Sequence, residues 1–276
     1  MLTKEKLVLL AQEDSDKVRE LAEIRSGEED SHFHGYLLEL GVIYGTSYKN
    51  LGERLARVGV EIGDLNLDNK YVVENGWLFP AYDSKGNWLY WINYSHTRDS
   101  NKKYLNVMPK QQKDKLVYGL DTFPEAIKHG QLVWVEGVID QCRLASYGVP
   151  TVATIGTYVS EYMKVLSKRV QTNVIIPDND ADGNDSVGRD FGSKLQSQLT
   201  NARVTNLSYV KDVDDCYTDI PEQFFWIVDQ LTPWEEHSYL EEMFGEDSEE
   251  DIEEESSEWE NEYDGYEEYN YDDYEQ

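Results

Sequence analysis

The chain has 276 residues, enough for two modest domains or for one domain with appendages. Its formal net charge of −30 is unevenly placed, because residues 235–276 hold 21 of the 55 acids and no Lys or Arg. The other residues carry 34 acids against 25 bases, so the total charge does not exclude nucleic-acid binding. The composition of residues 235–276 is dominated by Glu, Asp, Tyr and Ser, which predicts a disordered acidic tail.

The two cysteines, Cys142 and Cys216, are too few for a disulfide framework and fit a reducing cytoplasm. A zinc finger within the chain is excluded because it needs about four Cys or His ligands in tight pairs. We interpret His32 and His34 as a helix-entry or surface pair and not as a metal site. The first residues predict a mixed-charge helix and no signal peptide, and no stretch approaches the ~20 apolar residues of a membrane span. We therefore expect a soluble, cytoplasmic protein without a membrane partner.

The amino-terminal part reads as helical. Apolar residues at helical spacing predict one amphipathic helix over residues 3–25, within an N-terminal helical segment at 1–34. Residues 35–58 predict further helices, broken near Gly41 and Gly45.

The apolar period then changes to two, which predicts a β-hairpin with strands at 77–82 and 87–94 around a turn at 83–86. Pro80 places its strand at a sheet edge or beside a bulge. The second strand carries Trp88, Tyr90, Ile92 and Tyr94 on one face. These side chains are interpreted as sheet packing, with stacking on bases as the alternative.

Residues 96–115 reverse the charge of the protein locally, with six bases and two acids. The bases are Arg98, Lys102, Lys103, Lys110, Lys113 and Lys115. They belong to a basic α+β subdomain expected at 35–130. The segment is either a solvated loop or a surface that contacts nucleic-acid phosphates, where each Lys would release counterions on binding.

From residue 131 to 234 strands alternate with helices, which predicts a Rossmann-like α/β domain. The expected strands are 131–135, 151–155, 173–176 and 204–210. The expected helices are 138–147, 160–169, 185–199 and 221–230. Crossover helices between consecutive strands require a parallel sheet with helices on its faces.

Acids follow three of these strands. Glu136 ends the first strand, Asp178 and Asp180 end the third, and Asp212 and Asp214 follow the fourth. The carboxyl ends of parallel strands share one edge of the sheet, so these acids are expected to converge there. Such carboxylates repel one another unless a cation neutralises them, and Mg²⁺ prefers oxygen ligands. Two ions about 4 Å apart would support in-line phosphoryl transfer.

The order Glu136-Gly137, Gly156-Thr157 and Asp178-x-Asp180-x-x-Gly183 resembles the Toprim domain of primases, topoisomerases and certain nucleases. The resemblance covers residues 131–216. It implies that Glu136, Asp178 and Asp180 are catalytic and, with Asp212, bind metal. Asp140 and Asp214 resemble further acids of primase members, and Gly137 and Gly156 support the site. By themselves, Asp140 and Asp214 could also be a helix-start acid and part of a polar turn.

The upstream residues narrow the resemblance. Phe79-Pro80-x-x-Asp83-x-x-Gly86, a K-Y-L-N segment at 103–106 and an L-V-Y-G-L segment at 116–120 are similar to the RNA polymerase core of DnaG-type bacterial and phage primases. This implies RNA primer synthesis on single-stranded DNA from NTPs, with Mg²⁺ or Mn²⁺ and two ions expected. The implied contacts to template and nucleotide are Arg98, Lys102, Lys103, Asn106, Lys110 and Lys113. The chain departs from the family at Trp77, where a basic residue is usual, and after Asp180, where arginines are usual.

No zinc-binding domain and no G-x-x-x-x-G-K-[ST] motif occur, so we expect a separate zinc-binding template reader and no fused helicase. A replicative helicase or single-strand-binding protein is the expected partner, in a host cytoplasm if the protein is phage-encoded. The alternatives are a Toprim nuclease that uses the same acids and a non-catalytic replisome adaptor or DNA mimic. The tail either solubilises the protein, docks on a partner, or occupies the basic surface in place of DNA.

Overall fold

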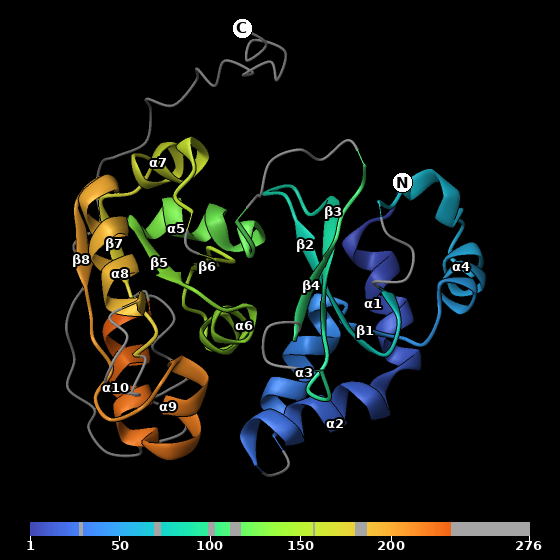
Figure 1. The fold of residues 1–276 in the computed structure, drawn as a ribbon, viewed down its shortest axis with the longest axis horizontal. Coiled ribbons are helices and arrows are strands. Elements are labelled where there is room, and N and C mark those ends of the chain that lie inside the picture. The colour runs from blue at the N-terminus through green and yellow to red at the C-terminus, as the bar shows by residue number, and fades with distance from the viewer. Residues whose placement is uncertain are drawn as a thin grey trace, which may run out of the picture. The chain divides into compact units, whose positions relative to one another are not determined.

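The computed structural model describes residues 1–27, 30–68, 73–98, 103–110, 117–156, 158–179 and 187–232, without the side chains of 187–190. By its contacts the chain divides into Met1–His237 and Ser238–Gln276. The predicted tail at 235–276 lies outside the described residues, all of which belong to the first unit (Figure 1).

The N-terminal part consists of three helices, α1 (Lys4–Glu13), α2 (Ser15–Ser26) and α3 (Ser31–Leu40). The prediction of one continuous helix over residues 3–25 is therefore wrong, because the helix breaks at Asp14. At the break the Asp14 carboxylate accepts hydrogen bonds from Tyr44 N at 2.7 Å and from Arg54 Nη2 at 2.6 Å. These partners are 30 and 40 residues away, so local periodicity could not reveal them.

An antiparallel sheet follows, in the order β1-β2-β3-β4. Its strands are β1 (Ile43–Gly45), β2 (Gly76–Tyr82), β3 (Trp88–Tyr94) and β4 (Tyr104–Val107), and α4 (Tyr48–Arg57) and the 3₁₀ turn η1 (Ile62–Leu65) follow β1. The predicted hairpin is confirmed as β2 and β3, with Phe79 opposite Ile92. The three-residue strand β1 was not predicted, since it is too short to show a period.

Pro80 does not mark a sheet edge, because β2 lies between β1 and β3. Pro80 instead lies beside a bulge, since the register of β2 against β3 shifts between Ala81 and Tyr82. β1 pairs with β2 only as far as Leu78, so the missing N–H of Pro80 removes no bond to β1.

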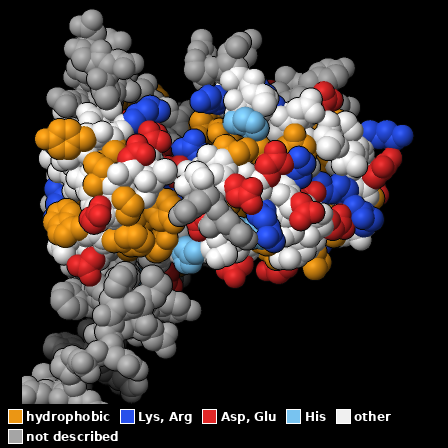
Figure 2. Space-filling view, turned by 90° about the horizontal axis from the view of Figure 1, so that it is seen from below, with side chains coloured by type: hydrophobic (Ala, Val, Ile, Leu, Met, Phe, Trp, Pro, Cys, Tyr) orange, Lys and Arg blue, Asp and Glu red, His pale blue; other side chains and the backbone are white. Residues whose placement is uncertain are grey.

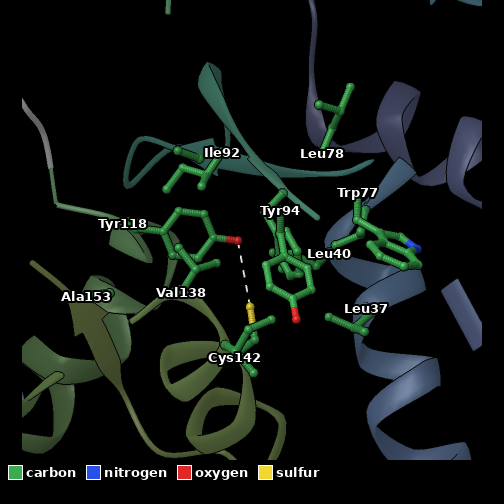
Figure 3. Packing of buried hydrophobic residues seen from close by; sticks show 14 of the residues in the cluster. Leu37, Leu40, Trp77, Leu78, Ile92, Tyr94, Tyr118, Val138, Cys142 and Ala153 are labelled. Carbon is green, nitrogen blue, oxygen red and sulfur yellow. Dashed lines mark hydrogen bonds between the residues drawn. The ribbon is translucent and has the colours of Figure 1, made fainter. Parts of the chain in front are cut away.

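The hairpin aromatics are packing residues. Tyr90 and Tyr94 are each 2 % exposed and Ile92 is fully buried. In Figure 3, Ile92 and Tyr94 of β3 lie on one side of this core, and Val138 and Cys142 lie on the other. These side chains thus help to form the core that joins the antiparallel sheet to the α/β part.

The α/β part contains a four-stranded sheet in the order β6-β5-β7-β8 in which all pairs are parallel. The strands are β5 (Gln131–Val135), β6 (Thr151–Ala153), β7 (Thr172–Ile175) and β8 (Ala202–Val204). The helices are α5 (Phe123–His129), α6 (Val138–Ser146), α7 (Glu161–Ser167), α8 (Val187–Gln198), α9 (Val213–Asp219) and α10 (Pro221–Leu231), with the 3₁₀ turn η4 (Leu120–Thr122) before α5. The predicted fold class is confirmed.

Two elements of this part differ from the sequence prediction. β8 ends at Val204, although the expected strand reached residue 210, because the apolar residues Leu207 and Val210 are buried in a connection rather than paired in a ladder. Asp214 and Asp215 are the first turn of α9, not a polar turn between elements.

Both faces of the parallel sheet are covered, which explains the apolar sequence of β5. Leu132 and Trp134 pack with side chains of α5, α7 and α8 in one core. Val133 and Val135 pack with α6 and with the antiparallel sheet in the other. A strand buried on both faces lacks polar alternation, so charge can enter only where the strand ends.

The surface carries mixed charges. Figure 2 shows Lys and Arg side chains interspersed with Asp and Glu over much of this face, and hydrophobic side chains gathered toward one side. Large exposed hydrophobic residues include Tyr209, at 96 % exposure, and Trp226 of α10, at 59 %. Within the described residues, no helix has the length and apolar character that crossing a membrane requires.

Candidate functional site

The ends of two neighbouring strands bring Glu136 and Asp178 together. β5 pairs with β7 up to Trp134 and Ile175, and the next residues reach the same edge of the sheet. There the backbone N–H of Asp178 donates to Glu136 Oε1 at 3.2 Å. The two residues thus lie at the same edge of the sheet, as expected, although they are 42 residues apart in the chain.

Gly137 allows a third acid to approach. It is the residue before α6, and a Cβ there would overlap the Oδ2 atom of Asp140 on the first turn of that helix. A larger residue at this position would force the Asp140 carboxylate to move, which gives the Glu-Gly pair of the sequence a physical reason. Asp140 is buried, with 6 % exposure.

The loop before α9 supplies Asp212. Its Oδ1 accepts the N–H of Asp215 at 2.9 Å and so caps the helix. The loop is tied to the end of β7, because Asn179 N donates to the Lys211 carbonyl and Asn179 Nδ2 donates to the Val210 carbonyl at 3.2 Å. The residue between Asp178 and Asp180 therefore joins the two acid-bearing loops.

Neighbouring acids affect the pKa values of Asp140 and Lys211. Burial raises the pKa of Asp140 well above its usual value, and the negative charges of Asp212, Asp178 and Asp214 raise it further. Burial alone would lower the pKa of Lys211, but the charges of Asp212 and Asp178 raise it. Lys211 Nζ lies 3.4 Å from Asp212 Oδ2, and the lysine side chain is 58 % exposed.

Asp214 has a different environment. It is 1 % exposed, and its carboxylate is paired with Arg143 Nε at 2.9 Å and Arg25 Nε at 2.7 Å. Its backbone N–H donates to Asp140 Oδ1 at 3.0 Å. Asp214 is therefore next to the acid group but is itself neutralised by two guanidinium groups.

The donor set is chemically suited to Mg²⁺ or Mn²⁺, because every candidate ligand is a carboxylate oxygen. Among the residues that the structure describes, however, no three Asp, Glu, His or Cys side chains stand close enough together to hold a metal ion. Asp180, the second acid of the D-x-D motif, lies outside the described residues. Glu136, Asp178 and Asp212 are the described acids at this edge whose carboxylates suit such a cation by their chemistry, but as placed they do not form a complete metal site.

A cavity of about 270 Å³ adjoins Asp178. It is lined by Pro177, Asp178, Asn179, Asn206 and Leu207, at the carboxyl edge of β7 and β8. A larger cavity of about 410 Å³ lies in the N-terminal half, where Leu2, Trp88 and Pro109 are among its lining residues. We place the candidate site at the smaller cavity because the larger one is not lined by any of the predicted site residues.

The predicted nucleic-acid contacts divide into two groups. Lys102 and Lys113, like Lys115, lie outside the described residues. Lys110 and Asn106 are exposed and Lys103 is half-exposed, with Asn106 on β4 opposite Ile92. The fourth, Arg98, turns its guanidinium to the carbonyl of Glu74 at 2.7 Å and so has a structural contact.

Gly156 stands at the end of β6 with φ of 116°, a conformation that favours glycine. The preceding residue, Ile155, donates its N–H to the Glu136 carbonyl at 3.2 Å. The Gly156 turn thus supports the backbone of Glu136, while Thr157 lies outside the described residues.

Sequence reasoning missed Arg25, Arg143 and Lys211. Arg143 had no clear signal in the sequence, because the burial of the run Val138–Leu144 that contains it is seen only in the structure. A buried Arg requires an acid partner, but the sequence alone could not say which. Arg25 gave no signal either, because it stands on a helix with many charges.

Comparison with known proteins agrees with this geometry. Residues 133–217 match the protein-family model described as Toprim-like. This span contains Glu136, Asp178 and Asp212, so the α/β part of the chain is a Toprim-like domain. A search of curated proteins found no match.

Solved structures extend the similarity to the upstream half. The zinc-binding and RNA polymerase domains of the Aquifex aeolicus primase match with TM-score 0.60 and 20 % identity, over 83 % of this chain and 62 % of that one. The RNA polymerase domain of Mycobacterium tuberculosis primase DnaG matches with TM-score 0.62 and 19 % identity, covering 82 % and 80 %. The E. coli primase catalytic core matches with TM-score 0.60 and 20 % identity, covering 86 % and 80 %. The chain therefore has the fold of a DnaG primase catalytic core, and it spans less than two thirds of the Aquifex chain.

Proposed function

We propose that the protein is the catalytic core of a DNA primase, which makes short RNA primers on single-stranded DNA from NTPs. The observation that carries this proposal is the meeting of Glu136 and Asp178 at neighbouring strand ends, joined by a hydrogen bond of 3.2 Å. It occurs in a fold shared with DnaG catalytic cores along more than four fifths of this chain.

In this proposal Glu136, Asp178 and Asp212 hold Mg²⁺ or Mn²⁺, together with Asp180, and two ions are expected. The bound cation would neutralise charge on the triphosphate and the attacking oxygen. Glu136 either binds this cation or accepts the proton of the primer 3′-hydroxyl. The chain would also position the primer end and the nucleotide in line, and this positioning together with charge neutralisation would do most of the catalytic work.

The template would lie along the basic segment, on Lys103, Asn106 and Lys110, together with Lys102 and Lys113. One similar structure, a DnaG primase catalytic domain with TM-score 0.54 and 19 % identity, is bound to single-stranded DNA, which supports the proposal. Arg98 would act here by holding the segment to Glu74 rather than by touching phosphate.

Partners are part of the proposal. A replicative helicase or a single-strand-binding protein would bring the core to its template, and a separate zinc-binding protein would read the initiation site. The similar Aquifex structure contains a zinc-binding domain in the same chain. A phage origin would place all of this in a host cytoplasm.

A Toprim nuclease is the second candidate, because the same acids and the match at residues 133–217 fit either chemistry. One experiment separates the two. The protein is incubated with single-stranded DNA, labelled NTPs and Mg²⁺ or Mn²⁺, and the products are sized on a gel. New labelled RNA of short length supports a primase, whereas a shortened template without new RNA overturns it in favour of a nuclease. An intact template without new RNA favours the non-catalytic adaptor.

A further inference from the structure

Asp214 is held from two sides. Its Oδ1 accepts Arg143 Nε at 2.9 Å, and its Oδ2 accepts Arg25 Nε at 2.7 Å. Arg143 comes from α6 in the Toprim-like domain, and Arg25 comes from α2, 189 residues before Asp214 in the chain. An acid with a guanidinium on each carboxylate oxygen has little capacity left for a further cation.

Arg143 is anchored as firmly as its partner. It is fully buried, and its Nη1 and Nη2 atoms donate to Asp30 Oδ2 at 2.6 Å and Ser26 Oγ at 3.0 Å. The guanidinium lies between two aromatic rings, 3.7 Å from the centroid of Phe33 and 4.0 Å from that of Tyr217. Packing and hydrogen bonds together leave this side chain one position.

The charges of this cluster balance. Two acids, Asp30 and Asp214, face two arginines, Arg25 and Arg143, and Ser26 Oγ completes it by donating to Asp30 Oδ2 at 2.9 Å. Helices α2, α6 and α9 each contribute at least one member, and Asp30 is the N-cap residue of α3. The amino-terminal helices are thus bonded directly to the helix that follows Asp212.

Asp214 reaches the site through its backbone. Its N–H donates to Asp140 Oδ1 at 3.0 Å, and the next N–H, of Asp215, binds Asp212 Oδ1 at 2.9 Å. One oxygen of each of these acids is therefore set by the first turn of α9. The position of that turn depends on where Arg25 and Arg143 hold Asp214.

We propose that Asp214 is a positioning residue and not a cation ligand, and that Arg25 and Arg143 hold it so that α9 orients Asp140 and Asp212. This inference rests on the proposed metal-dependent function of the same edge. It gives α2 and α3 a role in the site, although both helices are far from the site residues in the sequence. Residues that orient ligands are commonly worth about 10- to 100-fold in metal affinity or activity.

The first experiment measures Mn²⁺ binding by electron paramagnetic resonance on the full chain and its variants Asp178→Asn and Asp214→Asn. We expect Asp178→Asn to lose detectable binding, whereas Asp214→Asn should weaken it by no more than about 10- to 100-fold. An equal loss in both variants would overturn the inference, because it would make Asp214 a ligand. The result does not require activity, so it stands even if the wild type makes no primers, an outcome that would refute only the proposed function.

The second experiment uses Arg25→Met, which removes the partner at the edge of the cluster, where the Arg25 side chain is 21 % exposed. We expect a folded protein whose kcat for primer synthesis falls about 10-fold, with little change in KM for NTP or in template affinity. Arg57→Met is the matched control, since Arg57 forms an exposed ion pair with Glu13 on the surface. A wild-type kcat in Arg25→Met would overturn the positioning role, and circular dichroism checks that both variants fold.

Discussion

Two buried aspartates, Asp30 and Asp140, have carboxylates with opposite electrostatic environments. Burial alone would raise the pKa of Asp30, but the Phe33 N–H, Arg143 and Ser26 bind its carboxylate and bring the pKa below the usual value. Burial raises the pKa of Asp140, and its charged neighbours are Asp212, Asp178 and Asp214. Within the described residues Asp140 forms no ion pair with Lys or Arg. Asp30 is neutralised by Arg143, whereas Asp140 lies among other acids.

The partners of an acid distinguish these residues better than their position in the sequence does. Asp212 and Asp214 are two residues apart, and both are buried at the start of α9. Asp214 is paired with two arginines, whereas the cation that the described part of the chain places beside Asp212 is Lys211 at 3.4 Å, on a side chain that is 58 % exposed. Counting acids at strand ends would assign both to the metal, although their partners differ.

The largest expected effect concerns the proposed metal site at Glu136 and Asp178. Glu136→Gln and Asp178→Asn should each lower primer synthesis by at least about 100-fold, the typical effect of removing one electrostatic contact to a transition state. Circular dichroism and the unfolding midpoint should stay close to those of the wild type, because both residues follow strands and do not form the core. Substantial activity in either variant would refute the assignment of the site.

The arginine cluster predicts a large effect on stability instead. Arg143→Ala should lower the free energy of unfolding by about 3–5 kcal/mol, since removing one partner leaves buried carboxylates uncompensated. Urea unfolding followed by tryptophan fluorescence measures this. Arg57→Ala serves as the control, and because its ion pair with Glu13 is exposed, a loss of only about 0–1 kcal/mol is expected. Similar losses in the two variants would mean that the cluster contributes no more than a surface pair.

The pKa shifts predict opposite pH dependences for the two aspartates. Asp140 binds its proton more tightly in the folded state, so its ionisation opposes folding as pH rises above the usual carboxyl value of 3.8 toward its raised pKa. Asp140→Asn should therefore stabilise the metal-free protein at neutral pH. Asp30 has the lowered pKa, so its contribution is present above 3.8 and is lost as pH falls through its folded pKa. Asp30→Asn should be destabilising at neutral pH.

Urea unfolding of the wild type and both variants across the acid range, in the presence of a chelator, measures this difference. Both variants should approach the wild-type stability at low pH, from above for Asp140→Asn and from below for Asp30→Asn. The same sign of effect in both variants at neutral pH would mean that Asp140 and Asp30 do not differ in how their ionisation affects stability. Added Mg²⁺ at 100 times its dissociation constant should stabilise the wild type by about 2.7 kcal/mol.

The smallest effect is expected at Lys211, the exposed cation beside Asp212. Exposed ion pairs contribute about 0–1 kcal/mol, so Lys211→Ala should raise KM for NTP by no more than about fivefold. Lys168→Ala is the matched control, because Lys168 is exposed and lies between α7 and β7, at the opposite edge of the sheet. Steady-state kinetics at two salt concentrations should show the Lys211 effect shrinking at high salt. An effect equal to that of the control would remove Lys211 from the site.

Much of the fold could be predicted because it follows from local patterns of apolar residues in the sequence. The hairpin of β2 and β3 follows from a period of two around the turn at 83–86, and β5 follows from an apolar run that ends at Glu136. The break at Asp14 could not be predicted, since its cause is a carboxylate bonded to Tyr44 and Arg54. The short strand β1 is decided by pairing with β2 and has no periodicity of its own.

For the site, the sequence by itself determined that acids stand where buried strands end and that glycine follows Glu136. Both are consequences of chain order, since a parallel sheet collects the ends of its strands at one edge. Only the tertiary structure decided which acid keeps its charge uncompensated. Arg25 and Asp214 are 189 residues apart and Arg143 and Asp30 are 113 apart, so no local pattern could pair them. The division between structural and functional acids arises from side chains that meet only after the helices have packed.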